Sequence, residues 1–175
     1  MGPVHSSKLD TEPLFAFDCG RDDQNEFLRR WAWPDQNARL STTYLLDVNG
    51  LVAGYITVCM DSLPLSRRER GVEIRYRNVS ALKLAQLGVD RRFQGMGIGR
   101  EAVLIALAFA NRVSEQVGCR YVTLDAHPAL EGWYQSLGFT TNRLRQQERL
   151  AEAGLHERDP AEVPVSMRFD LRQAA

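Results

Sequence analysis

Apolar and polar residues alternate in several short segments of the chain, which is typical of half-buried β-strands. Asn49-Gly50 stands between two such segments and indicates a two-residue β-hairpin. Gly54, inside the second of these segments, suggests a bulge. Strands are predicted at residues 14–17, 42–48, 51–60, 79–89, 120–126 and 163–171.

Other segments repeat their apolar residues with the period of a helix. Helices are predicted at residues 24–32, 101–117, 129–137 and 142–154. Asp22 and Asp23 would cap the first helix, Pro34 would stop it, and Gly118 would end the second. The last helix would turn Leu144 and Leu150 inward. Strands and helices together predict an α/β fold.

The length of 175 residues suits a single domain over 1–175, in which 140–162 would be an inserted helix and loop before the last strand. The net charge is zero, so no overall attraction to nucleic acid or membrane is expected. The three cysteines show neither metal-ligand nor disulfide spacing, which predicts buried free thiols and no metal. With no apolar run near the ~20 residues of a membrane helix, we expect a cytoplasmic protein.

The segment from Leu87 to Arg100 carries the strongest chemical signal. A strand ends at Val89, a polar turn with three alternate glycines follows, and then a helix begins. Glycines let the backbone approach a ligand, and the free N–H groups of a helix start favour an anion such as phosphate. The sequence lacks the Gly-Lys-Ser/Thr of a P-loop and the G-x-G-x-x-G spacing of a dinucleotide site.

Gln94-Gly95-Met96-Gly97-Ile98-Gly99 resembles the Q/R-x-x-G-x-G/A loop of the GNAT superfamily of acyl-CoA-dependent N-acyltransferases. The resemblance implies a mixed, mostly antiparallel sheet with splayed central strands and helices on both faces. It also implies acetyl-CoA as co-substrate. The residues that would contact it are Leu87, Gly88, Val89, Gln94, Gly95, Met96, Gly97, Ile98, Gly99 and Arg100.

Within that set, a backbone N–H near Leu87 to Val89 would stabilise the oxyanion of the transfer. Gly88 has two explanations at this stage. It either lets the pantetheine arm approach the strand edge, or is a glycine that the strand tolerates.

Trp133-Tyr134-Gln135-Ser136-Leu137-Gly138-Phe139 resembles the F-Y-x-x-x-G-F block of the same superfamily, with Trp133 in place of Phe. In that superfamily the tyrosine often lies beside the thioester sulfur. Tyr134 is therefore the candidate general acid, since a phenol of pKa ~10 is protonated at neutral pH and can donate to a leaving thiolate. The alternative is a core tyrosine whose hydroxyl meets a backbone group.

A general base is harder to assign. Glu73, Asp125 and Glu131 are candidates, but each also fits a solvated or capping carboxylate. An α-amine with a pKa near ~8 needs little help to lose its proton, which leans towards α-amine acceptors.

Phe17-Asp18-Cys19-Gly20, then Asn25-Glu26-Phe27-Leu28, resembles the F-D-C-G…L-N-x-F-L block of one GNAT branch. That branch contains the acetyltransferase toxins of toxin–antitoxin pairs, which acetylate the α-amine of aminoacyl-tRNA. The resemblance implies tRNA and a ribbon-helix-helix antitoxin as partners, and a homodimer. Residues 140–162 are longer than the branch's usual return to its last strand.

Arginines would bind the phosphates of such a substrate. The available patch comprises Arg67, Arg68, Arg70, Arg75 and Arg77 in the connection and Arg91 and Arg92 beside the glycine turn, and the candidates chosen from it are Arg75, Arg77, Arg91 and Arg92. The alternative is a solvated charged loop, which charge runs usually are, and the zero net charge favours it. Two further functions stay open: a GNAT enzyme acting on a small amine or a peptide N-terminus, and a non-catalytic CoA-binding regulatory module.

Overall fold

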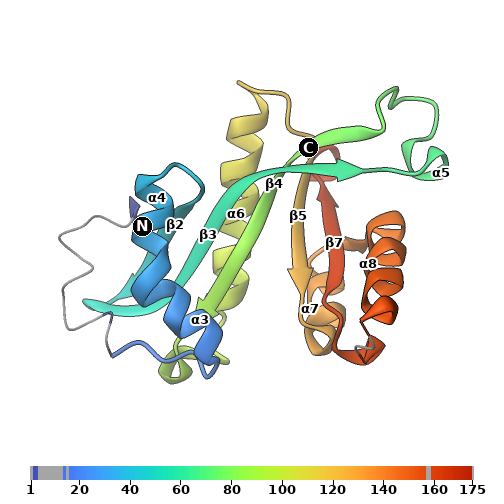
Figure 1. Ribbon diagram of the computed structural model, residues 1–175. Coiled ribbons are helices and arrows are strands. Elements are labelled where there is room, and N and C mark those ends of the chain that lie inside the picture. Colours follow the sequence, from blue (N-terminus) through green and yellow to red (C-terminus); the bar gives the residue numbers. More distant parts are fainter. Residues whose placement is uncertain (1, 4–13, 15, 157–158, 175) are drawn as a thin grey trace. The chain divides into compact units, whose positions relative to one another are not determined.

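The computed structural model describes residues 2–3, 14, 16–156 and 159–174 (Figure 1). The chain falls into two compact units. Unit 1 comprises Met1–Cys59 and Leu84–Phe109, and unit 2 comprises Met60–Lys83 and Ala110–Ala175.

Seven strands form a sheet in the order β1-β2-β3-β4-β5-β7-β6. They are β1 (Gly2–Pro3), β2 (Thr42–Val48), β3 (Leu51–Pro64), β4 (Asn78–Val89), β5 (Tyr121–Ala126), β6 (Thr140–Thr141) and β7 (Val165–Asp170). The pairs β1–β2, β2–β3, β5–β7 and β6–β7 are antiparallel, whereas β4 and β5 run in the same direction (Figure 1). The predicted mixed, mostly antiparallel sheet is confirmed.

The helical segments follow the predicted order but not all the predicted bounds. They are α3 (Asp22–Glu26), the π-helical turn η1 (Phe27–Trp31), α4 (Ala32–Asn37), α5 (Arg67–Arg70), α6 (Ile98–Ser114), α7 (Glu131–Ser136) and α8 (Arg143–Leu155). Short 3₁₀ turns lie at η2 (Arg91–Phe93), η3 (Pro128–Leu130), η4 (Pro160–Glu162) and η5 (Leu171–Ala174). None of the helices in the described part of the chain has both the length and the apolar character needed to span a bilayer.

The first helical segment corrects the prediction that Pro34 stops it. α4 continues through Pro34 to Asn37, and the π turn lies directly before it, with the Ala32 N–H bonded to the Phe27 carbonyl. A proline ring clashes with the carbonyl four residues back in a regular α-helix. A π turn spaces the carbonyls differently at that point, which accommodates the proline. Asp22 and Asp23 also do not cap the helix; they lie in its first turn.

The β2–β3 hairpin of unit 1 has the predicted turn. Asn49 and Gly50 both have positive φ, at 54° and 80°, as a type I′ turn requires. The register shifts between Leu46, which pairs with Gly54, and Asp47, which pairs with Val52. The predicted bulge is therefore present, and it lies next to Gly54, between Gly54 and Val52.

Helices cover both faces of the sheet in unit 1. Leu45 of β2 lies in a core cluster with Leu28 and Ala32 of the first helical segment. The neighbouring Tyr44 points the other way, and its ring lies 5.8 Å from that of Phe109 on α6. Successive residues of a strand face opposite sides, so the two contacts place a helix on each face.

The β5–β7 part of unit 2 has an apolar face and a polar face. Val122 and Leu124 pair with Phe169 and Met167 on the apolar face, while Thr123 and Asp125 share the opposite face with Tyr121.

Helix α8 lies on that polar face, which corrects its predicted orientation. Arg145 pairs with Asp61 at 2.9 Å and Arg149 with Asp125 at 2.8 Å, whereas Leu150 is 40% exposed. Arg145, Arg149 and the buried Ala153 are spaced by four residues, so they form the inward stripe. The prediction from apolar periodicity was wrong for this helix because the sheet face beneath it carries the carboxylates of Asp61 and Asp125, which pair with arginines.

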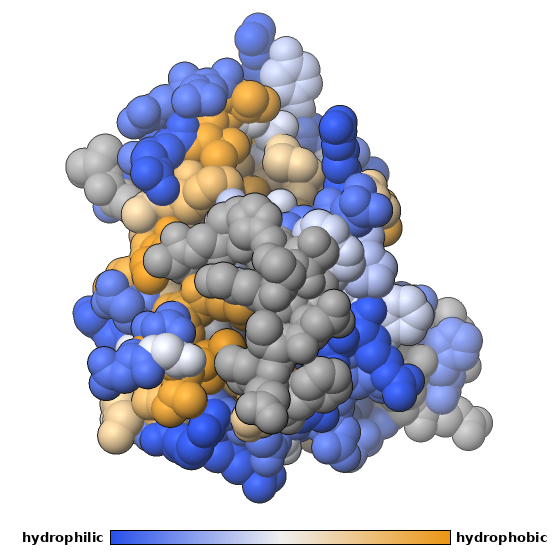
Figure 2. All heavy atoms as spheres, turned by 90° about the vertical axis from the view of Figure 1, so that its left-hand side faces the viewer, coloured by the Kyte–Doolittle hydropathy of each residue, from blue (hydrophilic) through white to orange (hydrophobic). Residues whose placement is uncertain are grey.

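The surface in Figure 2 is mostly hydrophilic, with hydrophobic side chains gathered between the charged ones. In unit 1 the exposed large hydrophobic side chains are Trp31, Leu40, Leu51, Met96 and Leu104. Cys19 and Cys119 are buried thiols, and Cys59 is partly buried.

Candidate active site

The glycine turn (residues 94–97) connects η2 to α6 in unit 1. Gly95 and Gly97 have φ of +76° and +85°, a region that other residues rarely adopt. A Cβ built on either residue has no atom within 4 Å, so open space lies in front of both. Met96 between them is 70% exposed. The turn therefore presents its backbone to solvent, as a loop that holds a ligand through its N–H groups must.

Helix α6 begins at Ile98, three residues earlier than predicted, so that Gly99 and Arg100 belong to its first turn. The Glu101 N–H donates to the Gly97 carbonyl at 3.0 Å. The N–H groups of Ile98, Gly99 and Arg100 therefore precede the helical hydrogen-bond ladder and carry the positive end of the helix dipole. Free N–H groups together with this dipole favour a bound anion. The helix also ends earlier, at Ser114, so Gly118 is not its cap.

Asp90 fixes the start of the loop that leads to the glycine turn. Its side chain is 2% exposed, and its carboxylate accepts hydrogen bonds from Arg92 Nε at 2.8 Å and Nη2 at 2.9 Å. It also accepts the backbone N–H groups of Arg92 at 2.9 Å and Asp18 at 3.1 Å. These bonds, that of the Arg92 side chain first, lower the pKa of Asp90 to about 2. Arg92 is thus engaged by Asp90.

The Asp18–Gly20 loop is tied to the same place. The Gln94 amide donates to the carbonyls of Cys19 at 3.0 Å and Val89 at 2.9 Å, and the Arg91 N–H donates to the Asp18 carbonyl at 2.9 Å. Gln94 therefore uses its side chain to tie the glycine turn to two neighbouring segments.

Asn25 of α3 completes this network. Its Oδ1 accepts the Cys19 N–H at 2.9 Å, and its Nδ2 donates to Asp18 Oδ1 at 2.8 Å. Sequence reasoning noted Asp18 and Asn25 as motif residues only. Their physical role, which is to hold the Asp18–Gly20 loop in shape, appears only when the hydrogen-bond partners are known.

Gly88 has a packing explanation. A Cβ at this position would lie 2.5 Å from Cε1 of Tyr55, closer than real contacts allow. Tyr55 is fully buried, packs against Phe17 and Phe27, and donates its hydroxyl to the Gln24 carbonyl at 2.9 Å. The tyrosine ring therefore occupies the space beside Gly88 and requires a residue without a side chain.

Tyr134 lies on α7 in unit 2 and is 7% exposed. Its ring packs edge-on against Trp133 at 4.7 Å and Phe139 at 5.7 Å. Burial raises the pKa of its phenol to about 12. Within the described residues the Tyr134 hydroxyl forms no hydrogen bond. The hydroxyl is also not fully enclosed by protein atoms. Among the described residues no backbone group therefore accepts from or donates to this hydroxyl, and the role of Tyr134 as general acid stays a prediction.

The three candidate bases are all engaged. Asp125 contacts Lys83 at 2.7 Å as well as Arg149; burial raises the pKa of Asp125, but these two cations outweigh burial and lower it. Glu131 accepts hydrogen bonds from Gln135 and Thr141, and Glu73 pairs with Arg172 on the surface.

The four candidate arginines divide into two kinds. Arg75 and Arg77 in unit 2 are exposed; Arg75 lies over the Tyr76 ring at 5.9 Å, and Arg77 has only a loose pair with Glu148 at 3.9 Å. Arg91 and Arg92 in unit 1 are held near Asp18 and Asp90. Arg75 and Arg77 are therefore the more available for a phosphate.

The profile of the acetyltransferase (GNAT) family matches residues 8–139. The chain belongs to this family. As a GNAT enzyme it is an acetyl-CoA-dependent N-acetyltransferase, and acetyl-CoA is its co-substrate. In the part of the chain that the structure describes, no three His, Cys, Asp or Glu side chains come together as metal ligands would.

Solved structures with the same GNAT fold include bacterial toxins. AtaT complexed with acetyl-methionyl-tRNAfMet is 23% identical, with a TM-score of 0.73 over 92% of this chain and 89% of that one. A Tyr-to-Phe mutant of AtaT bound to the C-terminus of the antitoxin AtaR is 22% identical, with a TM-score of 0.71 over 98% and 91%. A Tyr-to-Phe mutant of KacT is 18% identical, with a TM-score of 0.78 over 98% and 94%.

Proposed function

We propose that this GNAT enzyme transfers an acetyl group from acetyl-CoA to the α-amine of an aminoacyl-tRNA. The observation that carries the catalytic part is the glycine turn, with two residues at positive φ, open space before them and free helix N–H groups behind them. This arrangement supports residues 94–100 as the site of the CoA diphosphate.

The chemistry follows from two further elements. The neutral amine attacks the thioester carbonyl directly, forming a C–N bond, and a backbone N–H near Leu87 to Val89 stabilises the oxyanion. The C–S bond then breaks, and Tyr134 donates its proton to the leaving thiolate. The surplus proton of the amine passes to solvent, and the Tyr134 phenolate takes a proton back from solvent. The raised pKa of Tyr134 keeps the phenol protonated at neutral pH.

The carboxylates of Glu73, Asp125 and Glu131 all form ion pairs or hydrogen bonds within the protein, which makes them poor general bases. This favours an acceptor amine that needs no base. An α-amine with a pKa near ~8 is partly neutral at physiological pH, whereas a lysine amine at about 10.4 is not. This favours an α-amine over a lysine side chain.

Charged tRNA is supported by three observations. AtaT, which has the same fold, has been solved with acetyl-methionyl-tRNAfMet, and the Asp18–Gly20 loop belongs to the block that this chain shares with the toxin branch. Arg75 and Arg77 are exposed beside Tyr76, which is 70% exposed. Cations next to an exposed aromatic ring suit a nucleic acid.

The test combines product identification with one variant. The protein is incubated with acetyl-CoA and, separately, charged tRNA, small amines and N-terminal peptides, and acetylated products are identified by mass spectrometry. Tyr134→Phe should lower turnover by about 10²- to 10⁴-fold and leave CoA affinity unchanged. Tyr44→Phe, which removes a hydroxyl on β2 outside the proposed catalytic and tRNA-binding residues, should retain turnover.

Each outcome distinguishes the candidate functions. Acetylation of peptides or small amines alone would refute the tRNA acceptor and leave the general GNAT activity. CoA binding without transfer to any amine would indicate a regulatory module. Double substitution of Arg75 and Arg77 to Ala should weaken tRNA binding and flatten its salt dependence; an unchanged slope would exclude these two as phosphate contacts.

We also propose an antitoxin partner of the ribbon-helix-helix type and a homodimer. AtaT bound to the C-terminus of AtaR and the KacTA–DNA complex, both of the same fold, support the antitoxin. Growth arrest on expression, relieved by co-expression of the neighbouring gene, tests the first proposal, and light scattering of the purified protein tests the second.

A further inference from the structure

Unit 2 contains a pocket of about 420 Å³, formed by α5, the loop that follows it, and the adjoining ends of β5 and β7. Its volume lies in the range of small-molecule sites, which is about 300–1,000 Å³. Four arginines line it: Arg68, Arg70, Arg120 and Arg168. None of the lining residues belongs to the acyl-transfer residues proposed above.

Two of these arginines are neutralised within the pocket wall. Arg120 pairs with Asp170 through two hydrogen bonds of 2.7 and 2.8 Å, and Arg168 pairs with Glu69 at 2.7 Å. Both guanidinium groups also lie against the ring of Tyr121, at 5.6 and 5.7 Å from its centroid. This side of the pocket is therefore ordered, aromatic and close to neutral.

The other two arginines have no carboxylate partner in the described part of the chain. Arg70 donates through Nη1 to the Arg75 carbonyl at 3.2 Å, but its Nε is fully buried without an acceptor. Among the residues that the structure describes, Arg68 forms no hydrogen bond or ion pair. The third acid of the lining, Glu73, is paired with Arg172. The pocket thus carries two uncompensated positive charges and one buried donor, which costs free energy until an acceptor arrives.

We propose that this pocket binds a phosphomonoester, either of a free nucleoside monophosphate or of the 5′ end of an RNA. A phosphomonoester carries up to two negative charges, which match Arg68 and Arg70, and its oxygens accept the forked donors of arginine. The pocket is larger than a phosphate alone, and the apolar residues along it are Val72, which is fully exposed, and Ile74, which is partly buried. These leave room for an attached nucleoside at the rim. This site stands independently of the proposed acetyl transfer.

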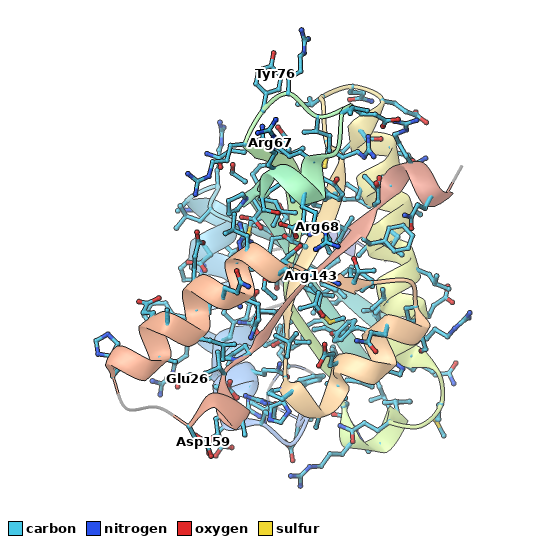
Figure 3. All side chains as sticks on the ribbon, turned by 90° about the vertical axis from the view of Figure 1, so that its right-hand side faces the viewer. Glu26, Arg67, Arg68, Tyr76, Arg143 and Asp159 are labelled. Atoms are coloured by element: carbon cyan, nitrogen blue, oxygen red, sulfur yellow. The ribbon has the colours of Figure 1, made fainter. Side chains whose placement is uncertain are left out.

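The test uses calorimetric titration of the full chain at constant ionic strength, with AMP, adenosine, inorganic phosphate and citrate as probes. AMP should bind at least about tenfold more tightly than adenosine, which lacks the phosphate and its two charge-assisted contacts. AMP should also bind more tightly than citrate, whose carboxylates supply the charge but carry no nucleoside. Arg68→Ala and Arg70→Gln should each weaken AMP binding about tenfold. Arg67→Ala is the matched control, since Arg67 is also exposed on α5 but does not line the pocket; Figure 3 shows the two side chains on different sides of that helix.

Two oligonucleotides separate the sources of the phosphate. Tighter binding of a 5′-phosphorylated RNA than of its 5′-hydroxyl counterpart identifies an RNA end, and binding of AMP without that difference identifies a free nucleotide. Equal binding of adenosine and AMP, equal binding of citrate and AMP, or an equal loss in Arg67→Ala would overturn the proposal. Circular dichroism of each variant establishes that the variant is folded. Arg68→Ala is the decisive variant, because Arg68 is exposed and its removal should not disturb the fold.

Discussion

Replacing Gly88 by alanine tests whether this glycine serves packing or cofactor approach. The added methyl would lie 2.5 Å from Cε1, 3.1 Å from Cδ1 and 3.2 Å from Cζ of Tyr55. The ring cannot retreat easily because it is fully buried between Phe17 and Phe27 and is held by its hydroxyl. Overpacking of this kind costs about 1–3 kcal/mol, and the constraint on the ring favours the upper value.

A loss of about 3 kcal/mol should lower the melting temperature by roughly 6–12 °C in a chain of this size. Urea unfolding gives the free energy directly, and the midpoint should fall with an unchanged m-value. Gly132→Ala is the control, because a Cβ at Gly132 in α7 has nothing within 4 Å and alanine favours a helix. That variant should be as stable as the parent or more so.

A double-mutant cycle makes the test specific to the contact. Tyr55→Leu alone is destabilising because it empties part of the core, but Gly88→Ala should cost less in that background, with a coupling energy of about 1–3 kcal/mol. Additive losses would refute the contact. Gly88→Ala with unchanged stability but lost CoA binding would refute the packing explanation and restore the predicted cofactor approach.

Two further predictions concern hydrogen-bonded groups. Gln94→Ala should weaken CoA binding several-fold by loosening the glycine turn, while Gln94→Arg, which keeps a donor, should recover most of it by calorimetry; equal losses would exclude the tie to Cys19 and Val89. Burial raises the pKa of Asp61, but Arg145 and Thr123 bring it from 3.8 to about 2. Its carboxylate therefore stabilises the fold by about 2 kcal/mol above pH 4, and this stabilisation is lost as the pH falls towards 2. When the free energy of unfolding is measured at a series of pH values, Asp61→Asn should lack this decrease between pH 4 and 2.

The elements that sequence reasoning found depend on local chemistry. Asn49-Gly50 requires positive φ at two successive residues wherever it occurs, and the glycine turn is defined by residues adjacent in sequence. The fold class followed from these elements, and the family resemblance supplied its arrangement.

The features it missed depend on distant partners. Arg145 and Arg149 face inward only because Asp61 and Asp125 come from two strands far away in the chain. Gly88 owes its identity to Tyr55, which lies on another strand. The hydrophobic pattern within one segment does not show which residues of a distant strand will lie against it.

The Asp18–Gly20 loop makes three successive amides report on the glycine turn. The N–H of Asp18 is held by Asp90, that of Cys19 by Asn25, and that of Gly20 by Asp18 itself, each through a side-chain oxygen. Because Asp90 and Gln94 tie this loop to the glycine turn, we expect the exchange of these three protons with deuterium to slow when CoA binds at the proposed site.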